Sequence, residues 1–493
     1  MAPGSSGTSG VVTASYCDFS NLGTGTFGNF GVVSQCDKAD NATSYDVSIT
    51  NCTFTKCNCA VLGGGNSWDK NFTFTDNNFS ASVTNSYSGY ASCCVFGINS
   101  TLSTGSRNIL RNYFDLGVSL YSMIQPTFVN NIFNATSSDI YPFINSGTSL
   151  WSNDTQFASN VFAFTKASTD VMPQLCGPAR DLYLINQTTS NPHFCFLAAN
   201  ATGTITLTGL IFDPINNASS DGGDGFLTNN MNSATTVKLR NCISLYNQAS
   251  PAWAANLFTL FGGLSNITLD VEHCTGYAGN QASAAYSESG NSTAGQLASY
   301  RGNLCWNTLT GKTTDKSFKL WDSGHQLSGG TSNVVSPTNA DYNASWNIQT
   351  TPASGNTYTY AGNGYQGNFT ATPGAHDLAD QSPAFIDSTR SLTTWGAANG
   401  YGSLALTLAY LATSPAALIP AMMAWVRAGF VPTNTALQAA SYPGDSSSTD
   451  ANGNAWPGGA PGIGALGYSS PATLTPPVLT MMPRVVRFYD PRE

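Results

Sequence analysis

The amino-acid sequence predicts an all-β solenoid, in which short strands wind into coils that stack along one axis. Charged residues form only 9% of the 493 residues, against about 25% in a typical soluble protein. Gly, Ser, Thr and Asn replace them, so strand formers and turn formers dominate the composition. Disorder is the rival interpretation, but 41% hydrophobic and 11% aromatic residues are enough to build a core. A recurring phrase then indicates the architecture.

An Asn beside a short run of strand formers recurs through the chain, as in LRNYFDLG at 110–117. The repeat positions are Cys17, Asn51, Asn77, Asn112, Asn131, Asn160, Asn186, Leu210, Asn241, His273 and Asn303. Their mean spacing is near 29 residues, and single spacings run from 19 to 35. A solenoid permits this variation because each coil keeps its short strands and lets its loops grow. A β-sandwich, the alternative, has hairpins at intervals of about 8–12 residues. We expect a solenoid of about 10–12 coils.

The Asn has two physical reasons to recur at a sharp bend between two strands of a coil. It tolerates the left-handed backbone conformation better than other residues except Gly. Asn side chains in successive coils also hydrogen-bond one another along the stacking axis. The neighbouring Phe, Ile or Cys would then stack inside the solenoid.

The chain resembles known proteins in three places. Residues 11–330 resemble the right-handed parallel β-helix proteins of the pectate-lyase-like superfamily, through their short strands, Asn ladder and variable coils. HDLADQSPAFIDSTRSLTTW at 376–395 and GIGAL at 462–466 are similar to closing segments of bacterial and phage β-helix proteins, with Gly462 replacing an acidic residue. The stretch 415–437 resembles helical tails of phage-encoded β-helix proteins. The resemblance implies a right-handed parallel β-helix of the kind found in phage virion and tailspike proteins.

Composition divides the chain into six segments. They are a flexible N-terminus at 1–10, the parallel β-helix at 11–330, irregular closing coils at 331–402, a helical cap at 403–440, a loop-rich closing segment at 441–470, and a Pro-rich linker with a basic docking arm at 471–493.

The apolar stretch 404–426 is long enough to be considered as a membrane span. TSP at 413–415 and then Pro420 interrupt it, so we expect two short buried helices instead. Ser414 is expected to be the N-cap of the second helix, with Pro415 at its first position.

The last ten residues carry three of the 18 basic residues. RVVRFYDPRE follows a Pro-rich connector, and we expect it to dock on a neighbouring subunit through Arg484, Arg487, Phe488, Tyr489 and Arg492. A frayed tail is the alternative.

The twelve Cys lie between Cys17 and Cys305 without paired spacing, which is atypical of a secreted disulfide scaffold. We expect them to be reduced and mostly in the core. The CNC at 57–59 and the Cys pair at 93–94 are the weak metal candidates, since no second pair of ligands stands at zinc-site spacing. Residues 1–10 have neither the basic nor the apolar region of a signal peptide.

Two acidic pairs are the candidate chemical sites. Asp270 and Glu272 in LDVEH share one face if the segment is extended, with His273 pointing the opposite way. Two carboxylates about 5–10 Å apart can hydrolyse a glycosidic bond. Asp221 and Asp224 in the loop SDGGDG are the candidate ligands of a metal ion, with Ca²⁺ as the ion, although Asp and Gly are also ordinary turn residues. We expect no other cofactor.

The polysaccharide-cleaving members of the resembled superfamily use clustered Asp with a basic residue, and their motifs do not carry over. No Asn-Thr-Asp with Gly-His-Gly occurs, and Gly324–His325 is followed by Gln326. Scarce charge also argues against a cleft for an acidic polymer. Trp151, Trp253, Trp306 and Trp321 are candidate sugar-stacking residues, although large aromatics in long turns more often pack beneath their own loops.

Two functions remain open. The first is a structural or adhesive virion protein of a phage: a β-helical spike, fibre or capsid decoration protein, expected to be homotrimeric. It would assemble in the host cytoplasm and lie on the exterior of the virion. Its partners would be copies of itself, other virion proteins and host surface polysaccharide. A net charge of −9 without a basic stripe argues against nucleic acid, and no membrane insertion is expected.

The alternative is a polysaccharide lyase or glycoside hydrolase on the same fold, such as a tailspike depolymerase. Fold alone does not separate the two functions, because enzymatic and non-enzymatic spikes share it.

Overall fold

The computed structural model describes strands, corners and helices along most of the chain. The described residues are 10–22, 32–36, 45–57, 59–63, 71–82, 93–98, 105–121, 123, 125–135, 143–145, 151–164, 174–186, 196–197, 203–214, 227–228, 235–245, 258–261, 267–277, 286–289, 296–306, 321–322, 340–346, 360–361, 365–366, 374–378, 381–439, 449–456 and 462–467.

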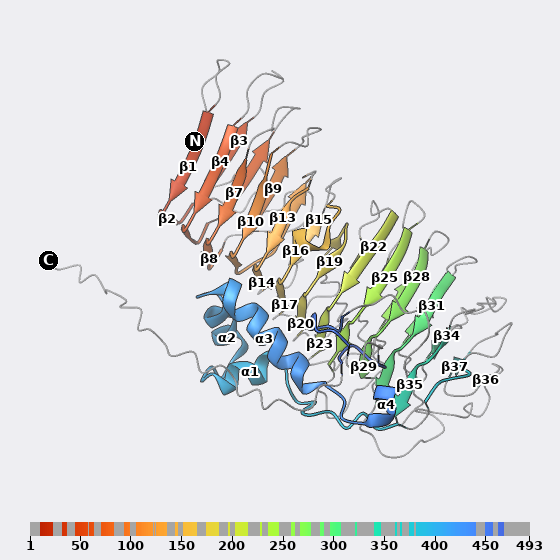
Figure 1. Cartoon of the computed structure of the whole chain (residues 1–493). Helices are drawn as coiled ribbons and strands as arrows, with labels where there is room; N and C mark the ends of the chain where they lie inside the picture. The colour runs from red at the N-terminus through yellow and green to blue at the C-terminus, as the bar shows by residue number, and fades with distance from the viewer. Residues whose placement is uncertain are drawn as a thin grey trace.

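Twelve stacked coils form an elongated parallel β-helix (Figure 1). Each coil gives one strand to a first twelve-stranded sheet and one to a second, and both sheets are parallel throughout. The first sheet contains, in order, β1 Gly10–Ser15, β4 Tyr45–Thr50, β7 Phe72–Thr75, β10 Arg107–Leu110, β13 Thr127–Val129, β16 Phe157–Ala158, β19 Ala179–Arg180, β22 Gly203–Thr208, β25 Thr235–Arg240, β28 Ile267–Glu272, β31 Gln296–Arg301 and β34 Ala340–Asp341.

The second sheet follows the same order of coils. Its strands are β2 Asp18–Ser20, β5 Thr53–Thr55, β8 Asn78–Ser80, β11 Tyr113–Phe114, β14 Ile132–Ala135, β17 Val161–Phe164, β20 Tyr183–Asn186, β23 Ile211–Pro214, β26 Ile243–Ser244, β29 Thr275–Tyr277, β32 Leu304–Trp306 and β35 Ala344–Trp346.

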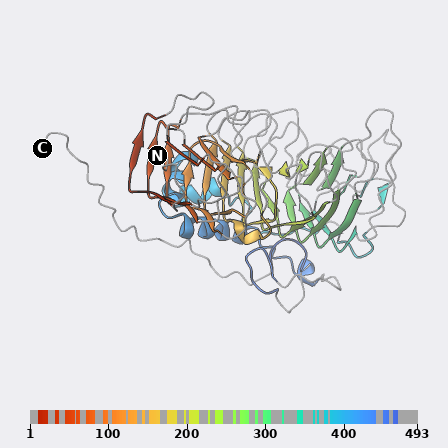
Figure 2. The same ribbon diagram turned by 90° about the horizontal axis from the view of Figure 1, so that it is seen from above.

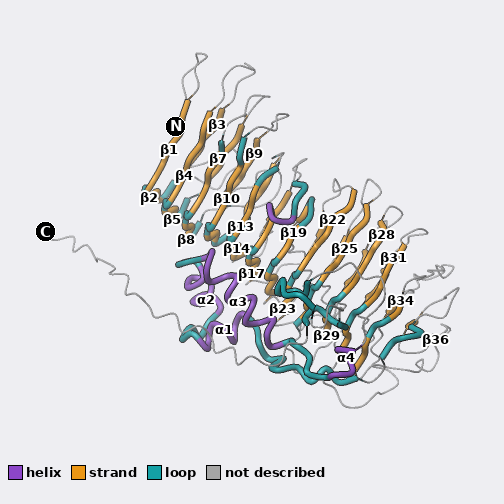
Figure 3. Tube along the Cα trace, viewed as in Figure 1, coloured by secondary structure: helices purple, strands orange, loops and turns teal. Residues whose placement is uncertain are grey.

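A third face is built from shorter sheets (Figure 3). Its first sheet is β3 Val32–Cys36, β6 Cys59–Gly63, β9 Cys94–Ile98, β12 Val118–Tyr121 and β15 Phe143–Asn145, and its second is β18 Gln174–Leu175, β21 Phe196–Leu197 and β24 Leu227–Thr228. The last is β27 Phe258–Phe261, β30 Tyr286–Ser289, β33 Trp321–Asp322, β37 Tyr365–Gln366 and β36 Tyr360–Ala361.

A two-residue corner joins each first-sheet strand to the second-sheet strand of the same coil. The first corner residue has a positive φ, between 52° and 68°, in all twelve coils. These residues are Tyr16, Asn51, Asp76, Arg111, Asn130, Ser159, Asp181, Gly209, Asn241, His273, Gly302 and Tyr342. Ten of the twelve are not Gly, although this conformation is uncommon for such residues. In the first ten coils the N–H of this residue donates to a carbonyl of the next coil, as Asn51 does to Thr75, so a backbone bond rather than a residue type holds the bend.

The second corner residue points into the solenoid. The twelve are Cys17, Cys52, Asn77, Asn112, Asn131, Asn160, Leu182, Leu210, Cys242, Cys274, Asn303 and Asn343, and all but Cys17 are buried. We call this column the corner ladder.

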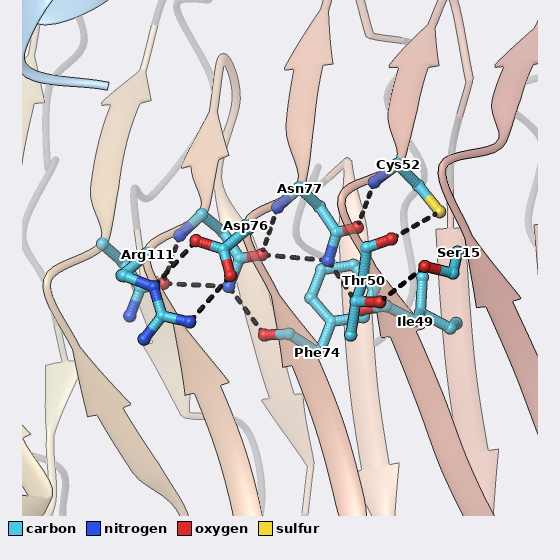
Figure 4. A network of polar contacts seen from close by, with 10 residues as sticks. Ser15, Ile49, Thr50, Cys52, Phe74, Asp76, Asn77 and Arg111 are labelled. Atoms are coloured by element: carbon cyan, nitrogen blue, oxygen red, sulfur yellow. Dashed lines mark hydrogen bonds and ion pairs between the residues drawn. The ribbon is translucent and has the colours of Figure 1, made fainter. Parts of the chain in front are cut away.

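The six Asn of the corner ladder hydrogen-bond one another in two runs. In the run from Asn77 to Asn160, each Oδ1 accepts both the backbone N–H and the Nδ2–H of the preceding Asn, at 2.9–3.1 Å. Nδ2 also donates to a carbonyl of the preceding coil, as Asn77 does to Ile49 at 3.0 Å (Figure 4). The run from Asn303 to Asn343 repeats this pattern. Corner backbone groups that no strand pairs are thereby satisfied.

Phe rings stack beside the ladder on the inner side of the second sheet. Successive centroids from Phe19 through Phe54, Phe79, Phe114 and Phe133 to Phe162 lie 4.4–5.3 Å apart. Later coils place Leu184, Phe212, Ser244, Gly276 and Cys305 in the column. Phe and Cys side chains thus stack inside as expected, whereas the Ile residues beside the corners, Ile132, Ile211 and Ile243, point outward, contrary to the expectation for Ile.

The C-terminal end of the stack is closed by residues 374–378. Asp377 Oδ1 accepts the N–H of Asn343 at 2.8 Å, in the place of a further ladder Asn. Leu378 forms a parallel bridge to Ala344. The predicted closing phrase GIGAL also packs on the stack, where Gly464 donates its N–H to Gly302 at 2.6 Å. Its φ is +97° and a Cβ would lie 2.8 Å from Thr275 Oγ1, so this position requires Gly.

Four helices follow the solenoid: α1 Leu392–Ala398, α2 Leu404–Leu411, α3 Pro415–Gly429 and α4 Thr435–Ala439. The predicted break at 413–415 separates α2 from α3, with Ser414 as N-cap and Pro415 at N1. Pro420 does not end α3, contrary to expectation. Pro420 and Ala416 both lie on the exposed side of α3. Pro420 has no N–H to donate to the Ala416 carbonyl, so the helix loses one hydrogen bond, and that carbonyl can accept one from water instead. No helix in the described part of the chain is long and apolar enough to cross a membrane.

These helices cover the outer face of the second sheet (Figures 1 and 2). Most outward residues of this sheet from β14 onward are apolar, including Ile132, Val161, Ile211 and Ile243, and they pack against the helices. In β2, β5 and β8 the corresponding positions are polar: Asp18, Thr53 and Asn78. The change from polar to apolar marks where the helical layer begins to cover the sheet.

The structure confirms an all-β solenoid of about 10–12 coils followed by a small helical segment. It corrects the predicted ladder in two ways. Asn51, Asn241 and His273 are first corner residues, so the predicted single column mixes two columns with different roles. Asn186 ends β20, and the true position in that coil is Leu182.

The solenoid also extends past residue 330, because β34 and β35 add a twelfth coil around Asn343. Helix α1 begins at Leu392, before the expected start of the helical segment at 403. Residues 1–9 and 468–493 lie outside the described residues, and with them the expected flexible N-terminus, apart from Gly10, and the expected docking arm.

Four cysteines match the expectation of reduced core residues: Cys52, Cys242, Cys274 and Cys305 carry free thiols and are buried. Cys17 also carries a free thiol but is only partly buried. Burial raises the pKa of Cys305 to about 12, so this thiol stays protonated near neutral pH. No group of three or more His, Cys, Asp or Glu suited to a metal ion occurs among the described residues.

Replacing a ladder Asn should destabilise the fold strongly. Asn77→Leu removes the acceptor of the Cys52 N–H and the donor to Ile49 O, leaving buried groups unpaired. We expect the free energy of unfolding, measured by urea titration, to fall by about 3 kcal/mol. The control is Asn78→Leu, the same change at the next, exposed residue, which should stay within about 0.5 kcal/mol. Equal losses in both variants would contradict a role for the ladder.

Candidate functional site

The predicted acidic pair lies on the outward face of the first sheet. Asp270 and Glu272 flank the buried Val271 in β28. In the register of the sheet, Lys238 and Arg240 of β25 lie on one side of the pair. Ser299 and Arg301 of β31 lie on the other. The two carboxylates therefore stand within a cluster of polar side chains that spans three consecutive coils.

Arg240 binds both carboxylates. Its Nη2 lies 2.5 Å from Asp270 Oδ2 and 3.3 Å from Glu272 Oε2, and Nη1 donates to the Asp270 carbonyl at 3.0 Å. On the other side, Ser299 Oγ donates to Glu272 Oε1 at 2.9 Å. All three charged side chains are at most 17% exposed. The ion pairs are therefore partly withdrawn from water, where Coulomb attraction is stronger.

Burial opposes the charge on Arg240, but the hydrogen bond to Asp270 and the charges of Asp270 and Glu272 outweigh it and raise its pKa. Arg240 is therefore a permanent cation between the two carboxylates. Glycoside hydrolysis needs one protonated carboxyl group as the general acid. Here Arg240 contacts both carboxylates and Ser299 donates to Glu272, so the pair is bonded within the sheet. In this arrangement the cluster serves to tie adjacent coils together.

His273 has no place in this cluster. It is the first corner residue after β28, it is buried, and its Nδ1 lies 3.1 Å from the Gly462 carbonyl. Its ring also packs near Trp456, with centroids 5.2 Å apart. The side chain thus contacts the closing segment, on the side away from Asp270 and Glu272.

The other predicted sites are placed only in part. Asp221 and Asp224 lie outside the described residues, as do Arg484, Arg487, Phe488, Tyr489 and Arg492. Of the four candidate sugar-stacking Trp, Trp151 is buried and donates Nε1–H to the Pro178 carbonyl at 2.6 Å. Trp306 is buried against Phe385 and Phe430. These two Trp therefore belong to the packing of the fold.

Sequence reasoning missed a buried polar contact between the second sheet and α1. Tyr183 and Asp213 are fully buried, and the Tyr183 hydroxyl donates to Asp213 Oδ2 at 2.5 Å. The N–H of Leu392, the first residue of α1, donates to the same hydroxyl oxygen at 2.7 Å. The signal in the sequence was Asp213 itself, a charged residue in an outward column that is otherwise apolar in the neighbouring coils.

A second missed contact fixes α3. Arg427 Nη2 donates to Asp181 Oδ1 and to the Gly209 carbonyl, both at 2.6 Å. Asp181 and Gly209 are first corner residues of two adjacent coils, in the part of the corner ladder where Leu182 and Leu210 replace Asn. A single charged residue within the apolar segment of α3 was the signal for this contact.

Comparison with known proteins identifies no relative: no protein-family model, no curated protein and no solved structure matches the chain. The interpretation of the site therefore depends on its geometry.

Removing the cation from the acidic cluster should destabilise the solenoid. Arg240→Ala leaves two partly buried carboxylates without their shared partner, and we expect the free energy of unfolding to fall by about 3 kcal/mol. The matched control is Arg180→Ala, because Arg180 is 46% exposed and its partner Asp181 keeps Arg427. That loss should be below about 1 kcal/mol. Similar losses in urea titrations of both variants would show that the cluster has no special role.

Stability should depend on pH through Asp213. Burial raises its pKa from 3.8 to about 6, although the bonds from Tyr183 and Leu392 lower it. The folded state therefore binds this proton more tightly than the unfolded state does. Its contribution to stability is complete below about pH 4 and is lost as the pH rises through about 6, by at most about 3 kcal/mol.

Asp213→Asn should remove this part of the pH dependence, since the amide oxygen still accepts the Tyr183 bond. Asp18→Asn changes an exposed carboxyl in the same sheet and should leave the dependence as in the wild type. Urea titrations at pH 4, 5, 6 and 7 measure it. An unchanged profile in the Asp213 variant would contradict this assignment.

Proposed function

We propose that the protein is a structural or adhesive component of a phage virion, such as a β-helical spike, fibre or capsid decoration protein on the exterior surface. The observation that carries the proposal is the state of the predicted acidic pair, which lies on an outward sheet face. Asp270 and Glu272 are bound by Arg240 and Ser299 and so support the stack rather than stand open for substrate.

The construction of the stack also supports this function. Two runs of the corner ladder and a row of stacked Phe rings connect successive coils along the axis. Such repetition gives a stiff rod whose strength is distributed over many equivalent contacts. Proteins that must survive outside a cell profit from this construction, and scarce surface charge suits contact with neutral surfaces and with copies of the same chain.

Polysaccharide cleavage is the second candidate, because Asp270 and Glu272 do lie on one outward face of a parallel β-helix. For this function the Arg240 contacts would have to open when substrate binds. Arg301 and Lys238 of the adjacent strands would then be the cations available to an acidic sugar chain.

Enzyme assays separate the two functions. We expect no release of reducing ends or unsaturated sugars when the protein is incubated with a panel of neutral and acidic polysaccharides. Antibodies against the protein should label the exterior of phage particles in electron micrographs. Cleavage that is lost in both Asp270→Asn and Glu272→Gln, with the fold intact by circular dichroism, would establish the enzyme instead. Cleavage that persists in both variants would place catalysis elsewhere.

A further inference from the structure

The first coil leaves the N-terminal end of the solenoid open. β1, β2 and β3 are each the last strand of their sheet, with no described strand beyond them (Figure 1). Inward residues of this coil, Val12, Ala14 and Phe19, are only partly buried, whereas Val47, Ile49 and Phe54 in the next coil are at most 4% exposed. Phe19 stacks on Phe54 with one ring face, so its other face points along the axis away from the core. Within the part of the chain that the structure describes, the core is thus only partly covered at this end.

Apolar side chains on the rim enlarge this surface. Val11 is 70% exposed and Tyr16 is 81% exposed, and they are the two most exposed large hydrophobic residues among those described. β1 reads GVVTAS and carries none of the usual protections of an edge strand, such as Lys, Pro or a bulge. An edge of this kind pairs readily with another strand.

We propose that the occupant of this end is a second copy of the chain, joined through a two-fold axis so that the two N-terminal ends meet. A two-fold interface uses the same surface on both copies. Placing the axis at Thr13 pairs β1 with β1 of the second copy in antiparallel fashion, with Val12 opposite Ala14 and Val11 opposite Ser15. Inward residues then meet inward residues, and the two cores become continuous.

Charge and geometry favour a second copy over the other occupants. Asp18 is the only charged residue among residues 10–22, so two such ends meet with little repulsion. With the two-fold axis at β1, the β2 strand of one copy lies opposite the third face of the other copy. The two Asp18 side chains are therefore kept apart.

The opposite end of the stack is not available to an N-terminal end. Residues 374–378 occupy it, with Asp377 on Asn343 and Leu378 on Ala344. Joining of N-terminal to C-terminal ends would need this segment to leave. End-to-end association is therefore closed at two copies rather than open to a filament. This inference goes beyond the proposed function, holds whether or not the protein belongs to a virion, and puts a dimer in place of the homotrimer expected from the sequence.

Light scattering after size exclusion, at several concentrations of the full chain, tests the proposal. We expect twice the chain mass of 51.7 kDa. Val11→Lys, which places a charge at the pairing edge, and Thr13→Pro, which removes a backbone donor from it, should each raise the dimer dissociation constant at least about tenfold. The matched control is Leu406→Lys, which alters an exposed Leu on α2 rather than on the first coil and should leave the dimer unchanged.

A covalent readout locates the axis. Thr13→Cys in a Cys17→Ser background should form a cross-linked dimer under mild oxidation, because the two introduced thiols face each other. Val11→Cys in the same background should cross-link less, since it opposes Ser15 of the second copy. A monomer at all concentrations, a trimer, or a dimer that persists in both Val11→Lys and Thr13→Pro would overturn the proposal.

Discussion

The hydrogen bonds of the corner ladder are the constraint on which the rest of the structure depends. At every coil the chain turns from one sheet to the next within two residues, and the turn leaves backbone groups that no strand pairs. An inward Asn accepts a backbone N–H, donates to a carbonyl of the preceding coil, and bonds the next Asn. Because one Asn side chain bonds groups of the preceding coil and of the next coil, it fixes the register of three successive coils. Regular register then places Phe on Phe and keeps each sheet parallel over twelve strands.

Where the ladder lacks Asn, other parts of the chain stabilise the corners. Leu182 and Leu210 cannot bond the backbone, and there Arg427 of α3 reaches the Gly209 carbonyl and the Asp181 side chain. At Cys242 and Cys274 the thiols are buried and interact with each other, while the closing segment meets the adjoining corners through Thr449 and Gly462. The helical layer is therefore part of the solenoid's own bonding, in addition to covering an apolar sheet face.

Sequence reasoning predicted the solenoid because its signal is repetitive and each coil must solve the same steric problem. It misplaced the ladder where the repeat is degenerate. Leu182 does not match the Asn of the repeat, so the pattern was assigned to Asn186, four residues later in the same coil. The predicted ladder also included Asn51, Asn241 and His273, which are first corner residues. That position accepts many residue types, and a pattern with a single column does not distinguish it from the second corner position. The twelfth coil was missed because its strands β34 and β35 contain only two and three residues.

The sequence predicted where the two carboxylates of the candidate site lie, but not that a cation binds them. Alternation along LDVEH places Asp270 and Glu272 on one face, whereas Arg240 lies 30 residues away from Asp270 in sequence and meets it only through the register of β25 and β28. Likewise, nothing local in the sequence couples Tyr183 to Asp213 and to α1, because that contact depends on how the helical layer packs. Long-range pairing in a solenoid with loops of variable length follows from the whole stack rather than from any one segment.

Hydrogen exchange at residue resolution tests the role of the corner ladder most directly. The backbone N–H groups of Asn77, Asn112 and Asn131 donate to the Oδ1 of the next ladder Asn. They should exchange as slowly as the central amides of β7, β10 and β13, although they belong to turns. Exchange of these three at the rate of exposed turn residues, with the neighbouring strands protected, would contradict a ladder that holds the coils together.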